Sequence, residues 1–446
     1  MIKSKILLLS GNYWPEPTGI GKYNGEMITW LAKKGMDCTV ITTYPYYPAW
    51  EIQKEYKSKS RWFSKETSLG EGKPIEIYRC PHYIPSRPSG FNRILSDLTF
   101  FLSAFLQIFG LLFSKKFDLI IVVVPAFHIG LLGILYSKIR GGKVIYHVQD
   151  LQIDAAKELG MIKSKLLLKL LFRIEKFILI NAHYVSTISE GMVTKLMEKC
   201  TKRITLFPNW VDTDAFHPMR EKVNLKQRYN FKEDEKIVLY SGAIGEKQGI
   251  ESLLSVAQLL LNSKIKFVIC GSGPYKDKLI AAVEELQLSN VVFLPLQPKE
   301  NFNTFLNMAD LHLVLQKSSA KDLVMPSKLS TILSVGGLAL VTATRKTSLY
   351  NIVTKHDMAI IIEPENVLDL QKYIMIAMEH SFTAIKDNAR KFALDYLHIN
   401  KVIENFLSDI QVHRTIKTDI KSENKWFVQP EKEEVLISNL DDAFTK

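Results

Sequence analysis

Short apolar runs alternate with longer amphipathic stretches along most of the chain, a pattern typical of strands alternating with helices. In the first half, the runs that indicate buried strands are Ile6–Leu9, Thr39–Thr42, Leu119–Val124, Val144–His147 and Tyr184–Thr187. In the second half they are Ile237–Tyr240, Lys266–Cys270, Val291–Leu294, Leu311–Leu315, Leu338–Thr342 and Ala359–Ile362. Because continuous apolar strands belong to parallel sheets covered on both faces, the pattern predicts an α/β fold with two Rossmann-like, doubly wound sheets.

The chain of 446 residues is too long for one ordinary core, so more than one domain is expected. We place an N-terminal domain at 1–210 and a C-terminal domain at 211–385. Terminal helices are expected at 386–412, packing back on the N-terminal domain. The polar segment 413–446 is expected to be a loosely ordered tail. In such folds ligands bind at the carboxyl ends of the strands, here facing the cleft between the domains.

Positive charge is concentrated in the first half of the chain. Residues 1–218 hold 29 of the 58 basic residues but only 18 of the 46 acidic ones, and so carry nearly all of the net charge of +12. A one-sided positive domain indicates an anionic partner, either nucleic acid, an anionic membrane or a phosphorylated acceptor. Nucleic acid is the least favoured of these, because no helix-turn-helix or RNA-binding signature is present. The four cysteines lack C-x-x-C and zinc spacing, which favours reduced thiols in a cytosolic protein.

Two segments are candidate membrane contacts. The apolar run Ile94–Phe113 is long enough to span a bilayer, but a buried helix and an interfacial helix are open alternatives. In Ser164–Ala182, cationic side chains recur at helical spacing beside apolar ones. They are Lys165, Lys169, Arg173 and Lys176. This basic stripe is either a solvated helix face or a surface that lies on anionic lipid headgroups.

A glycine-bearing turn is the main candidate for a ligand site. The segment Ser241–Glu251 (SGAIGEKQGIE) follows an apolar strand and leads into a helical run at Ser252–Leu261. Such a turn directs backbone N–H groups and the positive end of a helix at one point, which favours phosphate. Gly242, Gly245 and Lys247 therefore predict a diphosphate site that lacks the Walker spacing. The alternative is a plain turn with a solvated lysine.

Two further glycine pairs follow predicted strands. Gly19 and Gly21 lie in the opening loop NYWPEPTGIGKY, before a helix expected to begin near Lys22. Their backbone would face a donor phosphate or the acceptor, unless the loop is only a tight turn. Gly271 and Gly273, in CGSGP, would let a phosphate or a base approach the chain. The third glycine of the dinucleotide fingerprint is absent, which argues against NAD.

Polar side chains also lie at the end of the strand Val144–His147. His147 and Asp150 could hydrogen-bond a sugar hydroxyl or take its proton, although a strand-end histidine is often structural. The D-x-D triplet at Asp212 and Asp214 would suit Mg²⁺ or Mn²⁺. It lies at the expected domain junction, so an Asx-type turn is the better explanation and no metal site is predicted.

Taken together, these motifs resemble family 4 glycosyltransferases of the GT-B fold, in the colanic-acid-biosynthesis branch of the WcaI type. The matching segments occur in the expected order up to about residue 410. They are PEPTGIGKY, TTYPYYPAW, YRCPHYIPSRPSG, HVQDLQIDAAKELG, FPNWVDTDAFHP, SGAIGEKQGIE, MPSKL and EPEN. The resemblance implies that Gly19 and Gly21 form the N-terminal glycine loop. It also implies His147, Asp150 and Lys247 as candidate catalytic residues, the first two near the transferred sugar and the lysine at the diphosphate.

The chain departs from the family pattern at the donor. Many members carry two glutamates eight residues apart, the second of which holds the nucleotide ribose. Here Thr331 stands at the second position and Leu323, beside Asp322, at the first. Ser327 and Lys328 of MPSKL are expected to substitute at the donor.

The resemblance implies a hexosyltransferase that moves a sugar from a GDP- or UDP-sugar to a lipid-diphosphate-linked oligosaccharide of an exopolysaccharide, capsule or O-antigen. It implies retention of anomeric configuration, no metal and no other cofactor, with the protein working by positioning and charge stabilisation. The expected location is cytoplasmic, peripheral on the inner face of the plasma membrane. Two alternatives are a sugar-nucleotide 2-epimerase of the same fold and a non-catalytic assembly protein.

Overall fold

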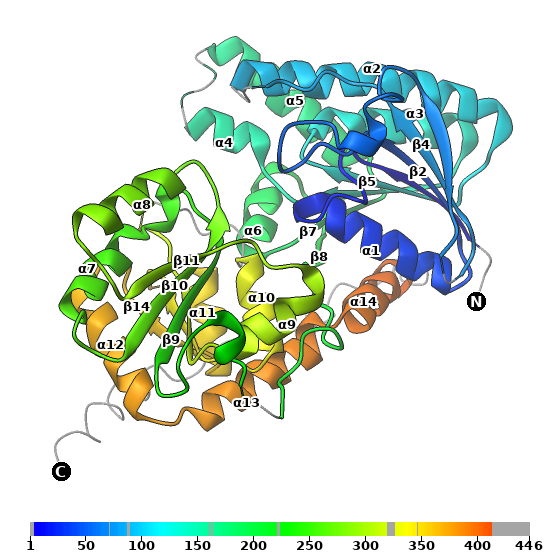
Figure 1. Cartoon of the computed structure of the whole chain (residues 1–446). Coiled ribbons are helices and arrows are strands. Elements are labelled where there is room, and N and C mark those ends of the chain that lie inside the picture. The colour runs from blue at the N-terminus through cyan, green and yellow to red at the C-terminus, as the bar shows by residue number, and fades with distance from the viewer. Residues whose placement is uncertain are drawn as a thin grey trace. The chain divides into compact units, whose positions relative to one another are not determined.

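A computed structural model describes residues 4–70, 72–86, 90–158, 160, 162, 164–220, 224–318, 326–345 and 347–412. They form two sheets, each with helices on both faces (Figure 1). Both sheets belong to one compact unit that ends at Phe406.

The first sheet has eight strands in the order β3-β4-β2-β1-β5-β6-β7-β8. Its strands are β1 (Lys5–Leu9), β2 (Asp37–Thr43), β3 (Ser64–Ser68), β4 (Ile75–Cys80), β5 (Leu119–Val124), β6 (Lys143–Val148), β7 (Tyr184–Thr187) and β8 (Ile204–Leu206). All pairs are parallel except β3 with β4. Its helices are α1 (Gly19–Lys33), α2 (Gly90–Ser114), α3 (Gly130–Arg140), α4 (Gln152–Glu158), α5 (Lys165–Asn181) and α6 (Glu190–Lys199).

The second sheet has six strands, all parallel, in the order β11-β10-β9-β12-β13-β14. They are β9 (Lys236–Ala243), β10 (Ile265–Ser272), β11 (Val291–Leu294), β12 (Leu311–Val314), β13 (Ala339–Thr342) and β14 (Ile360–Ile362). Its helices are α7 (Glu251–Leu259), α8 (Lys276–Glu285), α9 (Lys299–Asn307), α10 (Ser327–Ser334), α11 (Ser348–His356), α12 (Val367–Glu379) and α13 (Thr383–Phe392).

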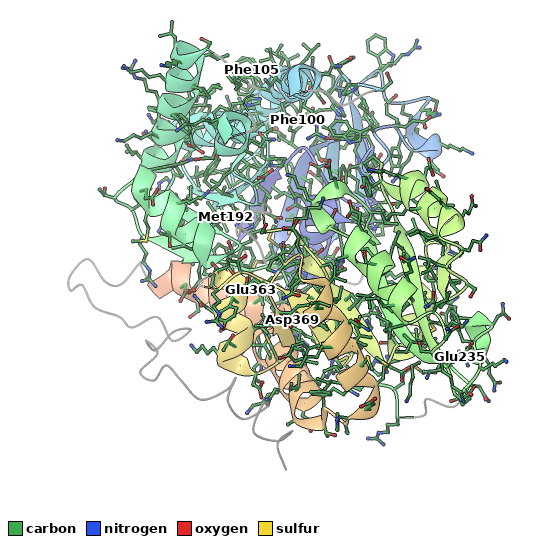
Figure 2. All side chains as sticks on the ribbon, turned by 90° about the vertical axis from the view of Figure 1, so that its left-hand side faces the viewer. Phe100, Phe105, Met192, Glu235, Glu363 and Asp369 are labelled. Carbon is green, nitrogen blue, oxygen red and sulfur yellow. The ribbon has the colours of Figure 1, made fainter. Side chains whose placement is uncertain are left out.

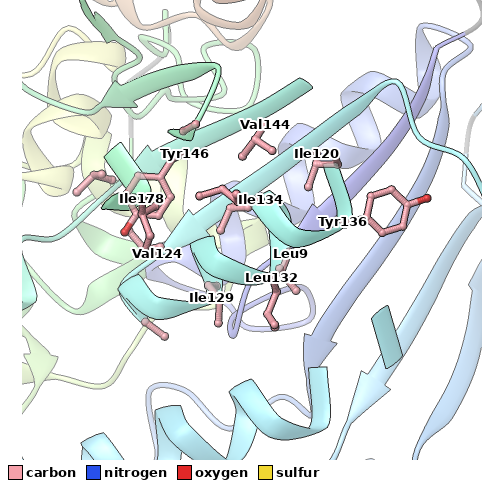
Figure 3. Packing of buried hydrophobic residues seen from close by; sticks show 14 of the residues in the cluster. Leu9, Ile120, Val124, Ile129, Leu132, Ile134, Tyr136, Val144, Tyr146 and Ile178 are labelled. Atoms are coloured by element: carbon pink, nitrogen blue, oxygen red, sulfur yellow. The ribbon is translucent and has the colours of Figure 1, made fainter. Parts of the chain in front are cut away.

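Apolar side chains on alternate strand positions build the cores, because successive residues of a strand face opposite sides of the sheet. In β9, Ile237 and Leu239 join one cluster while Val238 and Tyr240 join the other, so the second sheet has a core on each face. In the first sheet, α2, α3, α5 and α6 contribute to one large cluster. Figure 3 shows Leu9, Ile120 and Val144 of its strands beside helix α3.

The predicted fold class is confirmed, and each predicted strand segment coincides with an observed strand. The structure adds β3, β4 and β8, which the sequence analysis missed. β3 is a polar edge strand, SKETS, that pairs only with β4, and so it lacks the apolar run that marks a buried strand. The predicted domain boundaries stay a prediction.

The chain after α13 returns to residues of the first sheet's domain. A π-helical stretch, Ala393–Leu397, leads into α14 (Ile399–Val412). Within the compact unit, Trp30 of α1 donates from Nε1 to Asn400 Oδ1 at 2.6 Å. The rings of Phe207 and Phe406 stack with centroids 4.0 Å apart.

Candidate functional site

The predicted strand–turn–helix at the donor turn is present. β9 ends at Ala243, a short 3₁₀ turn covers Glu246–Gln248, and α7 follows. Gly242 has a φ of +143°, a backbone angle that residues with a side chain rarely adopt. The Gly245 N–H donates to Gln248 Oε1 at 3.0 Å, which ties the turn together. Lys247 is exposed on this turn.

The glycines after β10 allow two backbone segments to meet. A Cβ atom on Gly271 would overlap the carbonyl oxygen of Gly242, and one on Gly273 would meet the backbone of Ile244. Side chains at these positions would therefore separate the ends of β9 and β10. The structure thus gives these glycines a packing role, and their contact with a donor stays a prediction.

Helix α10 brings a second lysine to the turn. Ser327 is its first residue, and the Lys328 side chain extends to Gly242. A Cβ atom placed on that glycine would lie 3.3 Å from Lys328 Cε. Thr331 Oγ1 donates to the Lys328 carbonyl at 2.9 Å, so the Thr331 hydroxyl is bonded to the backbone of its own helix, α10. Asp322, the other predicted donor residue, lies outside the described residues.

His147 lies at the end of β6 and is only 3% exposed. Its Nδ1 is 3.0 Å from Ser186 Oγ, and its ring packs against Phe207 with centroids 5.1 Å apart. Burial lowers the pKa of His147 to about 3, so the imidazole is neutral at physiological pH. These contacts give His147 a packing role, and its role beside the sugar stays a prediction.

Asp150 follows β6 in a loop. Although the residue is largely exposed, desolvation of its carboxyl raises the pKa of Asp150, and the charges of Arg93 and Lys247 oppose this. Two predicted groups, the carboxylate after β6 and the lysine of the donor turn, are therefore close enough to act on each other electrostatically. This arrangement suits a site in which a cation and a carboxylate face one substrate.

The opening loop differs from the expectation. Helix α1 begins at Gly19 rather than near Lys22, because the extended Thr18 leads directly into the helix. Gly21 therefore lies in the first helical turn. A Cβ atom there would lie 2.7 Å from Glu16 Cβ, so this glycine makes room for the Glu16 side chain.

Glu16 is a buried carboxyl that the sequence analysis missed. It is 2% exposed, and its Oε1 accepts from the N–H groups of Tyr46 and Tyr47 at 3.2 and 3.0 Å. Its Oε2 accepts from Asn12 Nδ2 at 2.9 Å. Burial raises the pKa of Glu16 to about 7, against these hydrogen bonds. Glu16 thus joins the loop after β1 to the loop after β2.

A second missed carboxyl lies on α2. Burial raises the pKa of Asp97 to about 7, opposed by a side-chain hydrogen bond with Gln152 and by the charge of Arg93. The Arg93 guanidinium lies over the Trp50 ring, 5.1 Å from its centroid. Since Arg93 acts on Asp97 and on Asp150, these carboxyls on α2 and after β6 share one polar region. A lone carboxylate inside the apolar run Ile94–Phe113 was the signal that could have identified Asp97.

The D-x-D triplet forms the expected turn. Asp212 Oδ1 accepts from the N–H groups of Asp214 and Ala215 at 3.1 and 2.9 Å, which confirms an Asx-type turn. Among the described residues, no group of three or more His, Cys, Asp or Glu side chains could hold a metal ion.

The two candidate membrane segments are helices with exposed apolar faces. In α2, Phe100 and Ala104 are buried, whereas Leu102, Leu106 and Phe109 are more than half exposed. Figure 2 labels Phe100 and Phe105, which lie on different sides of this helix. By length and composition α2 could also cross a membrane over Asn92–Ser114. In α5, all four residues of the basic stripe are exposed: Lys165, Lys169, Arg173 and Lys176.

Comparison with known proteins shows the family to which the chain belongs. Residues 18–210 match the model of the glycosyl transferase 4-like domain, and residues 221–392 match that of glycosyl transferases group 1. The chain is 36% identical over 419 residues to WcaI of Escherichia coli (strain K12), covering 91% of this chain and 100% of that protein. The chain therefore belongs to the group 1 glycosyltransferases of family 4, enzymes with the GT-B fold. WcaI itself is named, provisionally, a colanic acid biosynthesis glycosyl transferase.

Solved structures support the fold alone, because their sequence identity is low. Sucrose-phosphate synthase from Thermosynechococcus elongatus has a TM-score of 0.69 at 14% identity, covering 93% of this chain and 100% of that chain. Anabaena HepE in complex with UDP and glucose has a TM-score of 0.65 at 13% identity, covering 92% and 100%.

Proposed function

We propose that this glycosyltransferase moves a sugar from a UDP- or GDP-sugar to a lipid-diphosphate-linked oligosaccharide, with retention of anomeric configuration. The product would be an exopolysaccharide, a capsule or an O-antigen. The observation that carries the proposal is the pair of lysines at the β9 glycine turn, Lys247 on the turn and Lys328 against Gly242.

The donor half of the proposal rests on charge. A leaving nucleoside diphosphate gains negative charge as the bond between the anomeric carbon of the sugar and the diphosphate breaks, and cationic lysine side chains beside the diphosphate would stabilise that charge. HepE, which has the same fold, was solved in complex with UDP and glucose, so a nucleotide and a sugar are ligands that this fold can hold. The acceptor hydroxyl would lose its proton to the leaving phosphate, so no side-chain nucleophile is required.

The acceptor half rests on the polar region of the first sheet. Carboxyl groups such as Asp97 and Asp150 accept hydrogen bonds from sugar hydroxyls, and Arg93 supplies a cation for a diphosphate. In the opening loop, Gly19 lies against Tyr47 and Gly21 against Glu16, and the Tyr47 N–H donates to the Glu16 carboxyl. These contacts support binding of an acceptor that combines hydroxyl groups with negative charge.

Membrane association is part of the same proposal. The basic stripe of α5 lies beside exposed apolar side chains, including Leu166, Leu170 and Phe177, and α2 exposes a second apolar face. Helices of this kind lie in the headgroup region of anionic membranes. We therefore place the protein on the cytoplasmic side of the plasma membrane, where a lipid-linked acceptor would be available.

Titration with UDP, GDP and dTDP, followed by a transfer assay in detergent, tests the proposal. Binding of a nucleoside diphosphate and release of that nucleotide only when the lipid-linked acceptor is present are expected. Conversion of the nucleotide-sugar to its 2-epimer without an acceptor would support the epimerase instead. Absence of nucleotide binding by the folded protein would support the assembly protein.

A further inference from the structure

Lys328 has surroundings that are unusual for a lysine. Its Nζ is buried and has no hydrogen-bond partner among the described residues. The amine lies over the Tyr240 ring, 3.6 Å from its centroid. A Cβ atom added to Gly242 would lie 3.5 Å from Nζ, so the amine rests against the backbone of the donor turn.

No anion in the described structure offsets this burial. Loss of solvation is the one cause that shifts the pKa of Lys328, which it lowers to about 7. The titratable group in contact is Tyr240, whose hydroxyl donates to the Ala243 carbonyl at 2.6 Å and whose own pKa is raised by burial. The other titratable side chains of the turn are Glu246 and Lys247, both exposed to solvent, and Glu251, whose Oε1 accepts from the Tyr275 hydroxyl at 2.6 Å and lies 3.6 Å from Lys317 Nζ. Thr331 of α10 bonds to the Lys328 carbonyl rather than to the amine.

We propose that the Lys328 amine takes up one proton from solvent when a nucleoside diphosphate binds at the β9 turn, and then holds the diphosphate as an ammonium. This inference rests on the proposed function. The step joins one neutral amine and one proton into one ammonium ion, and involves no redox change. A buried cation without a partner is costly, and a diphosphate supplies the missing partner.

The consequence is a pH-dependent donor affinity. Because the bound state holds one more proton than the free state, the Kd for the nucleotide rises with pH once the free amine is mostly neutral. The rise approaches tenfold per pH unit above neutrality. Lys247 is exposed to water and would make a charge contact of its own with the diphosphate.

Isothermal titration with UDP at pH 8.0, in buffers of different ionisation enthalpy, measures the proton uptake directly. The terminal phosphate of UDP is almost fully ionised at this pH, since such groups have a pKa of about 6. GDP replaces UDP if UDP gives no heat of binding. The expected result is an uptake close to one proton per nucleotide bound. An uptake near zero in the wild type would overturn the inference.

Three variants assign the proton to a residue. Lys328→Arg keeps a cation that does not lose its proton, so it should bind nucleotide with an uptake near zero. Lys328→Met should bind more weakly, by about tenfold or more at pH 7, also without uptake. Lys247→Met is the matched control, with weaker binding and unchanged uptake. Circular dichroism verifies that each variant is folded.

The outcomes separate this inference from the function on which it rests. Wild-type uptake that persists in Lys328→Arg would assign the proton to another group and overturn the inference alone. Failure of the folded wild-type protein to bind either nucleotide would overturn the proposed donor function and this inference together.

Discussion

Glu16 illustrates how one buried side chain arranges the loops of the candidate acceptor region. Its carboxyl is bonded to two backbone N–H groups of the loop after β2 and to Asn12 of the loop after β1. The fully buried Arg79 bonds to the same region, since it donates to the carbonyls of Trp14 and Thr43 at 2.8 and 3.2 Å. The buried side chains of Glu16 and Arg79 therefore hold both loops at the carboxyl ends of β1 and β2.

Glu16→Gln should change how stability depends on pH. The folded-state pKa of Glu16 is raised to about 7, so the native state binds more protons than the unfolded state between about pH 4.5 and 7. Ionisation of Glu16 therefore lowers the free energy of unfolding as pH rises through that window, by at most about 1.4 kcal/mol per pH unit. Glutamine removes this slope. Urea unfolding of both proteins at pH 5 and 7.5 measures it, and an identical pH dependence in the two would contradict the assignment.

Lys247→Ala should weaken nucleoside diphosphate binding. A charge-assisted contact to phosphate contributes about 1.5–3 kcal/mol, which corresponds to roughly ten- to hundredfold in Kd. The variant should stay folded, because the Lys247 side chain is exposed. Calorimetric titration checks the change in Kd, and wild-type affinity in a folded variant would mean that the donor turn is assigned wrongly.

At the scale of secondary-structure elements, α2 and α5 combine a buried face with an exposed apolar one. The buried residues Phe100 and Ala104 of α2 and Ile178 and Leu179 of α5 fix both helices on the first sheet. Within the part of the chain that the structure describes, the apolar side chains on their outer faces remain exposed to solvent.

Changing the four residues of the basic stripe, Lys165, Lys169, Arg173 and Lys176, to Gln should abolish binding to anionic vesicles at low salt. Each cation near such a surface contributes about 1 kcal/mol, and salt screens this attraction. Donor binding should be unaffected, because the donor turn belongs to the second sheet. Vesicle flotation at low and high salt is the measurement. Retention of the variant on vesicles at high salt would identify α2 as the anchor instead.

The sequence predicted the structure correctly where a local pattern of residues determines that structure. Apolar runs marked the buried strands, and the glycine turn after β9 was identified from its residues alone. Polar or very short strands such as β3 and β8 have no such pattern. Glu16 and Asp97 were missed because burial of a carboxyl depends on neighbours brought together by the fold. Lys328 and Gly242 were both predicted at the donor site. Their proximity could not be predicted, because it depends on two elements that are distant in sequence.

At the scale of the whole molecule, both sheets place candidate groups at the carboxyl ends of their strands, as expected for ligand sites in open α/β folds. Lysines that are proposed to bind phosphate lie after β9 and on α10, while carboxyls lie after β1 and β6 and on α2. The proposed function accordingly expects nucleotide recognition at the second sheet and acceptor recognition at the first.

Chelation of divalent metals should leave transfer intact. Asp212 is bonded to its own turn, and cations of the protein are proposed to stabilise the leaving diphosphate. Activity in EDTA should therefore equal activity in buffer alone. Complete loss that Mn²⁺ or Mg²⁺ restores would make a metal part of the mechanism.

The most direct test of the central claim is a transfer assay with a UDP-sugar or a GDP-sugar and a detergent-dispersed lipid-diphosphate-linked saccharide. The product is analysed by NMR for the configuration of the new linkage. The account predicts that the new glycosidic bond keeps the donor's anomeric configuration, and that Lys247→Ala strongly reduces product formation. A product with inverted configuration, or undiminished transfer by the folded Lys247→Ala variant, would contradict it.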